Sequence, residues 1–424
     1  MKVIVENVAK QCGGRICRIT SLPSRLGADV NKEFETPMVL QYTRGASFPH
    51  MSREVLELSN FDINLPIQIP LTSTFHMHEA LKVLKQPITS FSALPERPSF
   101  IVFNDPAEET RTGHNDKESM ALFTRNGKVP ITCEKYMEIV ETFQPDFFHV
   151  LCDGVTPHDC SKKRVIKAVD KSMKFFDDCL EKFKKSEQLK QSFLIASIEG
   201  GFSKESRQEI IKFLSKYENE INGYFLDGFH LNGLTATKDD TFNEKFYEII
   251  DFCIKSLPDS KLRFMFGAYP PLTILKLIQK GVDVFDTSYA YLATQSAHAL
   301  LFDVSDENNT EYAIDLSQEI FKDDFGPLKK DCKCLACKNH TRAYVNHLMN
   351  CKELLGSTLL MIHNTHHYLE FFRNIRESIK EDKLDVLIKI LEKQHKTIDL
   401  QEKQREKQPR FDDDDEDNAS MNSV

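Results

Sequence analysis

The chain has 424 residues, and its 55 Lys and Arg against 64 Asp and Glu give a formal net charge of −9. Apolar residues make up 41 % and charged residues 28 %, an ordinary globular mixture that excludes collagen-like, coiled-coil and wholly disordered chains. The acidic balance argues against a protein that grips nucleic acid over a wide surface, although it leaves room for a local basic patch.

The sequence shows no targeting or membrane-spanning signal. Residues 1–6 lack the apolar core of a secretory signal peptide, and no apolar run reaches the roughly 18 residues of a membrane helix. The 11 cysteines therefore indicate a reducing compartment, where they serve as free thiols or metal ligands rather than disulfides. We expect a cytoplasmic protein.

Strand and helix patterns alternate along the middle of the chain. Helical spacing of apolar residues predicts helices over 161–185, 206–217 and 271–279. Strand, helix, strand, helix means parallel strands with right-handed crossovers, and the number of runs favours an α/β fold of the (β/α)8 TIM type over an open sheet. The predicted buried strands are residues 38–42, 100–104, 147–152, 193–198, 223–226, 262–266 and 282–285.

Carboxylates and glycines follow several of these strands. Asp153, Glu199, Asp227 and Asp286 stand at or just after predicted strand ends. In a TIM-type barrel the chemistry lies at the carboxyl ends of the strands, so these residues together predict a real or inherited pocket. The alternative is that Asp and Gly merely begin loops there.

The strongest local motif is a cluster of three cysteines, Cys332, Cys334 and Cys337. Three thiolates at these spacings converge on one ion, and a fourth protein ligand would close a tetrahedral structural zinc site. An unmetallated cysteine cluster is the alternative. The spacing alone leaves the fourth ligand open among His340, His347, Cys351, His363, His366 and His367.

The cysteine cluster also carries a family resemblance. Cys-x-Cys-x-x-Cys followed 26 residues later by His363 resembles the zinc site of the tRNA-guanine transglycosylases, and segments 338–344 and 359–364 resemble the eukaryotic branch. Segments 36–38, 198–201 and 281–286 extend the likeness over most of residues 10–380. The resemblance implies a (β/α)8 barrel with a zinc-binding insertion near its C-terminal end, one structural Zn²⁺ per subunit, and Cys332, Cys334, Cys337 and His363 as its ligands.

The resemblance also implies a division of the chain. Residues 1–400 would form the transglycosylase-like barrel, including a zinc-binding subdomain at about 320–375. Residues 401–424 contain an unbroken acidic run, Asp412 to Asp417, and predict a disordered acidic tail.

The chain departs from the family at the positions that carry catalysis. The family's Asp-Ser-Gly-Gly-Phe-Gln loop corresponds to residues 103–109, where Asp105 survives but the glycines do not. A guanine-reading Gln becomes Glu199, which has only acceptors when ionised. Phe229 and His230 replace Leu and Ala and are expected to fill space that a purine needs. Asp286 matches the family nucleophile, but residues 287–301 contain no Lys or Arg to hold tRNA beside it.

These departures resemble the non-catalytic subunit of the eukaryotic enzyme, with no catalytic residues and with Asp105 and Asp286 as vestigial candidates. The family reaction exchanges guanine for queuine at wobble position 34 of tRNAs with GUN anticodons (Asp, Asn, His and Tyr). The implied partner is a catalytic queuine tRNA-ribosyltransferase subunit, bound as a heterodimer through residues 339–373. The non-catalytic subunit would stabilise the assembly and position tRNA, for which the Lys-rich helix 162–185 is a candidate surface. The resemblance adds peripheral contact with the cytoplasmic face of the mitochondrial outer membrane.

Two other functions stay open. The first is a self-sufficient tRNA-guanine transglycosylase with Asp286 as nucleophile and Asp105 as acid and base. The Arg-free run and the substitutions at Phe229 and His230 disfavour it. The second is a barrel scaffold with an unrelated binding role, which the cysteine motif and its flanks disfavour.

Overall fold

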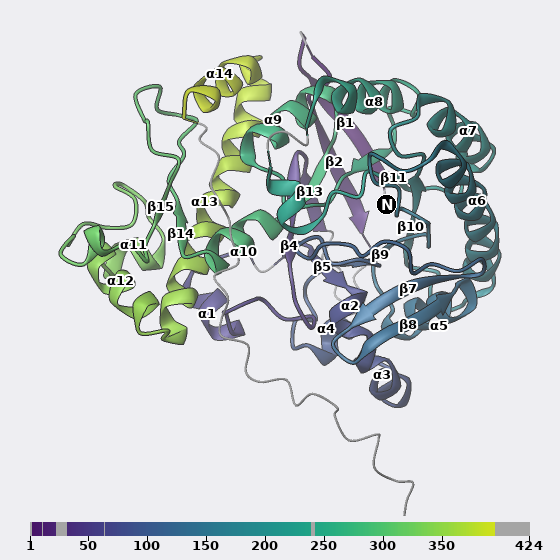
Figure 1. Cartoon of the computed structure of the whole chain (residues 1–424), viewed down its shortest axis with the longest axis horizontal. Helices are drawn as coiled ribbons and strands as arrows, with labels where there is room; N and C mark the ends of the chain where they lie inside the picture. Colours follow the sequence, from purple (N-terminus) through teal and green to yellow (C-terminus); the bar gives the residue numbers. More distant parts are fainter. Residues whose placement is uncertain (1, 11, 23–31, 63, 239–241, 395–424) are drawn as a thin grey trace, which may run out of the picture.

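The computed structural model describes residues 2–10, 12–22, 32–62, 64–238 and 242–394. Within these ranges, helices and parallel strands alternate around a central barrel (Figure 1). The predicted acidic tail, residues 401–424, lies outside the described residues.

Eight parallel strands close into the barrel, which confirms the predicted fold class. Their order around the barrel is their order along the chain, and the last strand pairs with the first where Val284 lies opposite Met38. One strand, Ile67–Pro70, is missing from the sequence prediction because a polar residue interrupts its four residues. The barrel strands are β4 (Met38–Tyr42), β5 (Ile67–Pro70), β6 (Ser99–Val102), β9 (Phe147–His149), β10 (Phe193–Ile198), β11 (Gly223–Leu226), β12 (Leu262–Phe264) and β13 (Val284–Asp286).

Helices connect the strands and cover the outside of the barrel (Figure 1). A hairpin of β7 (Ser119–Thr124) and β8 (Gly127–Thr132) is inserted before the helix that leads to β9. The connecting helices are α1 (Arg53–Leu58), α2 (Leu71–Thr74), α3 (His78–Leu84), α4 (Ile88–Phe91), α5 (Cys133–Phe143), α6 (Lys162–Lys185), α7 (Lys204–Leu214), α8 (Glu244–Lys255), α9 (Pro271–Lys280) and α10 (Ser288–Gln295).

The barrel interior is packed with aromatic side chains. Phe100 of β6 stacks on Phe147 of β9 and meets Phe266 edge-on, and Phe266 lies 5.2 Å from Phe225 between ring centroids. The interior is therefore a filled core rather than a pore.

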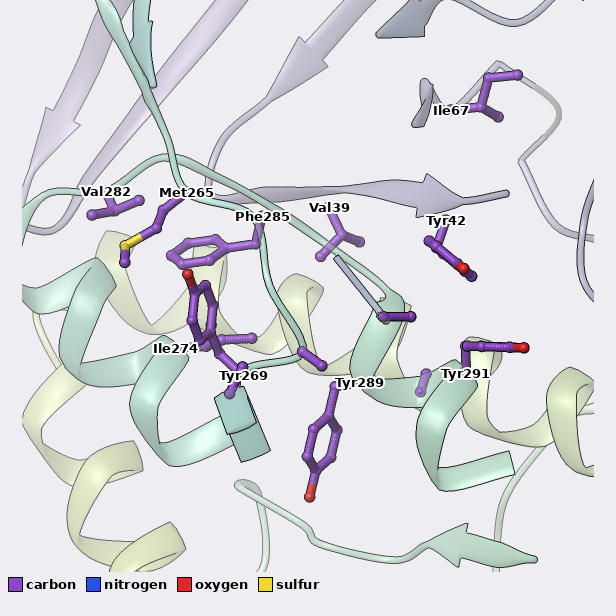
Figure 2. Packing of buried hydrophobic residues seen from close by; sticks show 14 of the residues in the cluster. Val39, Tyr42, Ile67, Met265, Tyr269, Ile274, Val282, Phe285, Tyr289 and Tyr291 are labelled. Carbon is purple, nitrogen blue, oxygen red and sulfur yellow. The ribbon is translucent and has the colours of Figure 1, made fainter. Parts of the chain in front are cut away.

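Alternate residues of each strand face the surrounding helices instead. Val284 belongs to the interior cluster, whereas its neighbour Phe285 belongs to the outer layer. Figure 2 shows Phe285 beside Tyr269 of the loop after β12 and Ile274 of helix α9. The same alternation places Val39 of β4 in the outer layer.

An antiparallel sheet of β1 (Lys2–Val8), β2 (Arg15–Leu22) and β3 (Lys32–Glu35) packs against the amino ends of the barrel strands. Cys17 and Phe34 of this sheet join the interior cluster. Arg15 is fixed beside the barrel by two hydrogen bonds of 2.8 and 2.7 Å to the buried carboxylate of Asp283. The amino end of the barrel is thus closed, and its carboxyl end is left for function.

The C-terminal elements form a subdomain beside the barrel (Figure 1). Residues 344–372 fall in two helices rather than one, because the chain breaks at 351–353, where Lys352 has a left-handed φ of 58°. The second helix packs on α10 and β14. These elements are β14 (His298–Leu300), β15 (Ala313–Asp315), α11 (Leu335–Asn339), α12 (Arg342–Asn350), α13 (Leu354–Lys380) and α14 (Leu384–Gln394).

Candidate functional site

The structure brings Cys332, Cys334, Cys337 and His363 together, with their ligand atoms all within 4.8 Å of one another. The Nδ1 atom of His363 lies 3.8 Å from the sulfur of Cys332, 3.7 Å from that of Cys334 and 3.3 Å from that of Cys337. A tetrahedral zinc ion with Zn–S near 2.3 Å and Zn–N near 2.0 Å separates its ligand atoms by about 3.5 Å. The four side chains therefore fit such an ion without rearrangement of the backbone.

Local structure orients each ligand. Cys334 caps the amino end of α11, and its sulfur accepts a hydrogen bond of 3.3 Å from the backbone N–H of Cys337. His363 lies on α13, and its Nε2 lies 2.9 Å from the carbonyl oxygen of Leu300 in β14. An N–H at Nε2 donates to this carbonyl and leaves the Nδ1 lone pair for a metal. The cluster thus ties α11, α13 and β14 together.

The other candidates for a fourth ligand lie elsewhere. His347 lies 3.7 Å from the exposed Cys351 through its Nδ1 atom, one helical turn away on α12. His367 stacks on His363 with ring centroids 5.9 Å apart and is not part of the four-atom cluster. Four protein ligands around one point leave no open position, so a metal held there is structural rather than catalytic.

At the carboxyl end of the barrel, Asp286 is 1 % exposed and bound on both oxygens. The oxygens accept hydrogen bonds of 2.8 Å from the N–H of Gly267 and 2.7 Å from the N–H of Ser288. Burial raises the pKa of Asp286 to about 6, although these hydrogen bonds oppose the shift. The side chain that matches a nucleophile thus joins the loop after β12 to the start of α10.

Asp105, in the loop after β6, likewise fixes neighbouring groups through hydrogen bonds. It accepts hydrogen bonds from the Tyr42 hydroxyl (2.8 Å) and from the Ala107 N–H (2.9 Å). Burial, followed by the neighbouring Glu108 carboxylate, raises the pKa of Asp105 to about 7. Asp105 also lines a wide hollow of about 1190 Å³, in which Arg44 forms an ion pair with Glu108.

A second cavity at the carboxyl end of the barrel is small. It measures about 30 Å³ and is lined by residues of β5, β6, β9 and β11, among them Gln68, Asn104, Cys152 and Asp227. A volume of this size holds about one water molecule. Binding sites for small molecules typically measure about 300 Å³ or more.

Phe229 is placed differently from the sequence prediction. Phe229 and His230 are not among the residues that line this small cavity. The Phe229 ring instead packs under the Arg207 guanidinium, 3.9 Å from its centroid, and against Phe246 of α8. Among the residues that do line the cavity, the aromatic ones are Phe103, Phe225 and Phe266.

The run without Lys or Arg, residues 287–301, is enclosed by the chain itself. In α10, every residue from Ser288 to Thr294 is buried, and α13 packs along this helix. The hydroxyl of Thr294 accepts a hydrogen bond of 2.9 Å from the side-chain amide of Asn364.

The strand-end carboxylates separate into two groups. Asp153 turns outward and pairs with Arg164 and Lys171 at 2.5 and 3.6 Å. Glu199 and Asp227 instead meet at Cys152, all three ligand atoms being within 4.8 Å of one another. The sequence predicts the two carboxylates as pocket residues at strand ends but does not predict Cys152. A single cysteine among the apolar residues of a strand gives no signal of its own.

Fold and site together define an α/β barrel protein with an attached Cys3His cluster. A model of the queuine tRNA-ribosyltransferase family matches residues 11–397. Proteins named queuine tRNA-ribosyltransferase accessory subunit 2 are 40 % identical in Aedes aegypti over 398 residues (93 % of each chain) and 39 % identical in Drosophila virilis over 402 residues (94 % of each chain). The protein of that name from Drosophila melanogaster is 39 % identical over 93 % of each chain. The chain belongs to the queuine tRNA-ribosyltransferase family.

Proposed function

We propose that this chain is the non-catalytic subunit of a queuine tRNA-ribosyltransferase complex. The complex would exchange guanine for queuine at wobble position 34 of tRNAs with GUN anticodons, and this subunit would stabilise the assembly and help to position tRNA. The names of the relatives support the accessory role. The observation that carries the non-catalytic part is the cavity of about 30 Å³ that Cys152 and Asp227 line at the strand ends, which cannot hold a purine. The hollow of about 1190 Å³ is a separate space, lined by Arg44 and Glu108 rather than by these strand-end residues.

The carboxylates at this end support the same conclusion. A nucleophile needs access to its substrate, whereas Asp286 is 1 % exposed and each of its oxygens accepts a backbone N–H group. The segment after it offers no cation for a phosphate, and the chain's own α13 covers α10.

We further propose that Cys332, Cys334, Cys337 and His363 hold one zinc ion. The separations between their ligand atoms and the Leu300 carbonyl behind His363 support this assignment. The ion would supply no reactive group. It would cross-link the loop before α11 to α13 and so rigidify the subdomain.

The same subdomain offers a surface for the catalytic partner. Ile320, Phe325 and Leu354 are 74 %, 77 % and 74 % exposed, and Tyr344 and Leu355 are 40 % and 41 % exposed. Large apolar side chains gathered on one subdomain are typical of a protein interface. Within the predicted interface, residues 339–373, the middle of α13 adds little to this surface, because Leu359–Ile362, Tyr368, Phe371 and Phe372 are buried within the chain.

Guanine exchange measured with and without a catalytic subunit tests the proposal. The purified chain alone should incorporate no radiolabelled guanine into tRNA, and the Asp286→Asn variant should support the complex within a few-fold of the parent. Losing a true nucleophile costs orders of magnitude. Incorporation by the isolated chain that Asp286→Asn abolishes would establish the self-sufficient enzyme instead.

The proposed function includes a place in the cell. In the described part of the chain, no helix is long and apolar enough to cross a membrane. We propose a cytoplasmic protein with peripheral contact at the mitochondrial outer membrane. Protein released from purified mitochondria by salt washing supports such contact, and absence from the mitochondrial fraction contradicts it.

A further inference from the structure

Three side chains with metal-binding atoms converge at the carboxyl ends of three neighbouring barrel strands. Cys152 follows β9, Glu199 follows β10 and Asp227 follows β11, and β10 pairs with both other strands. The sulfur of Cys152 lies 3.7 Å from Oδ2 of Asp227, and one ligand atom from each residue lies within 4.8 Å of the other two.

The Glu199 carboxyl group is buried between the Asp227 carboxylate, the Cys152 thiol and the Arg207 guanidinium. Its side chain is 0 % exposed, and among the described residues neither carboxylate oxygen has a hydrogen-bond partner. The buried Arg207 next to it donates three of its five N–H groups to the backbone carbonyl oxygens of Ile198, Gly201 and Asp227, at 2.8 to 2.9 Å. Burial and the neighbouring Asp227 carboxylate raise the pKa of Glu199, so this site needs either a proton on Glu199 or a further positive charge.

The space beside the cluster suits an ion and little else. A side chain at Gly154 would approach Oδ2 of Asp227 to 2.6 Å, so the glycine leaves room only for the carboxylate. The adjoining cavity of about 30 Å³, which Cys152 and Asp227 line, admits one water molecule but no organic cation. His149 nearby is already occupied, because its Nε2 accepts a hydrogen bond of 2.9 Å from the Phe103 N–H and its Nδ1 lies 3.0 Å from the Val150 carbonyl oxygen.

We propose that Cys152, Glu199 and Asp227 bind one thiophilic divalent cation of the zinc class, with a water molecule as its fourth ligand. A thiolate among the ligands disfavours Mg²⁺ and Ca²⁺, which prefer oxygen alone. Zinc bonds of about 2.0–2.3 Å need ligand atoms about 3.5 Å apart, which small side-chain rotations provide here. The ion would neutralise the two carboxylates and clamp β9, β10 and β11 where the family's base site has been lost. This inference does not depend on the proposed function.

The zinc content of the chain distinguishes a bound metal ion from the alternative, a protonated Glu199 carboxyl group without a metal. The full chain is incubated with excess zinc, freed of unbound metal by gel filtration and analysed by elemental mass spectrometry. The parent should carry two zinc ions per chain, and Glu199→Gln and Cys152→Ser should each carry one, retained by the Cys3His cluster. Asp105→Asn is the matched control, a buried carboxylate at the same end of the barrel but outside the cluster, and it should retain two.

Other outcomes overturn the proposal. A single zinc ion in the parent means that the Glu199 carboxyl is protonated and no second site exists, whether or not the variants can be purified. Two zinc ions retained in both Glu199→Gln and Cys152→Ser would place the second ion elsewhere, for example on the acidic run at 412–417. When the zinc-loaded parent is treated with a chelator and only the weaker site is refilled with Co²⁺, a sulfur-to-cobalt absorption band should appear and should be absent in Cys152→Ser.

Discussion

At the scale of single residues, each ligand of the Cys3His cluster is predicted to be necessary for zinc binding. Replacing Cys334 by Ser removes one thiolate and should cost the chain the zinc of this cluster. Structural zinc contributes on the order of 10 kcal/mol to ordering its surroundings, so the subdomain should lose its cooperative unfolding transition. Elemental analysis and thermal melting measure the two effects.

Cys351 provides the matched control for this loss. It is an exposed cysteine on the same subdomain and lies outside the cluster. The Cys351→Ser variant should keep its zinc and its melting temperature. A full zinc content in a Cys334→Ser, Cys337→Ser double variant would show that these cysteines are not the zinc ligands.

The buried Asp105 predicts a pH dependence of stability. Its pKa in the folded chain is about 7, above the usual 3.8, because burial disfavours the charged form. Its protonated form therefore stabilises the fold fully below about pH 3.8, and this contribution is lost as the pH rises to about 7. In Asp105→Asn the side chain stays neutral, and its amide can still bond Tyr42 and Ala107.

The stability of Asp105→Asn relative to the parent should rise between pH 4 and 7, by up to about 4 kcal/mol, and then stay constant. Denaturant unfolding at several pH values measures this difference. For Asp286→Asn the corresponding rise should end near pH 6, since the pKa of Asp286 is about 6. A difference that stays flat with pH for both variants would mean that neither carboxyl has a raised pKa.

At the scale of elements, helix α6 is the candidate surface for tRNA. Lys162, Lys163 and Lys167 are exposed near its amino end, whereas Lys184 and Lys185 near its carboxyl end pair with Glu220 and Glu181. Replacing the three exposed lysines by Glu should weaken tRNA binding by the assembled complex.

Salt dependence distinguishes a phosphate contact from a general effect of charge. Each lost phosphate contact lowers the slope of log affinity against log salt concentration by roughly 0.7–0.9, so the triple variant should lose about two. The Lys184→Glu, Lys185→Glu pair on the same helix is the control and should bind tRNA as the parent does. An unchanged slope in the triple variant would exclude α6 from the tRNA surface.

The elements also show how far the sequence predicts this structure. Long apolar runs such as β10 and the amphipathic α6 are confirmed within a residue or so, because burial and helical periodicity are local properties. Strand β5 was missed because closure of the barrel, rather than its own four residues, makes it a strand. The break between α12 and α13 likewise depends on a single left-handed residue, Lys352, for which lysine gives no signal.

The candidate sites follow the same division. The motif of three cysteines predicts a metal cluster from spacing alone, and the family resemblance adds His363. The fold then brings His363, rather than the five other candidates, to the three sulfur atoms. The sequence predicts that Phe229 and His230 fill the base site, whereas the Phe229 ring packs on the buried Arg207. The direction of a side chain after a barrel strand depends on which neighbour offers it a surface, and sequence spacing does not record this.

At the scale of the whole molecule, the distribution of exposed apolar side chains predicts the assembly. Phe325 and Leu354 lie on the Cys3His subdomain and are 77 % and 74 % exposed. A stable heterodimer would bury upwards of about 2,000 Å² around such residues. Light scattering of an equimolar mixture with the catalytic subunit at micromolar concentration should give the mass of one chain of each kind.

The double variant Phe325→Glu, Leu354→Glu should abolish this complex and leave the barrel folded, because both side chains point away from the core. Val83→Glu on α3 is the control, since Val83 is similarly exposed at 81 % but α3 lies well away from α11 and α12 (Figure 1), and this variant should still pair. Charge at an interface centre is costly because the partner's apolar groups cannot hydrate it, whereas charge at Val83 meets only water. If the parent chain stays separate from the catalytic subunit, or if the double variant pairs as the parent does, the Cys3His subdomain is not the docking surface.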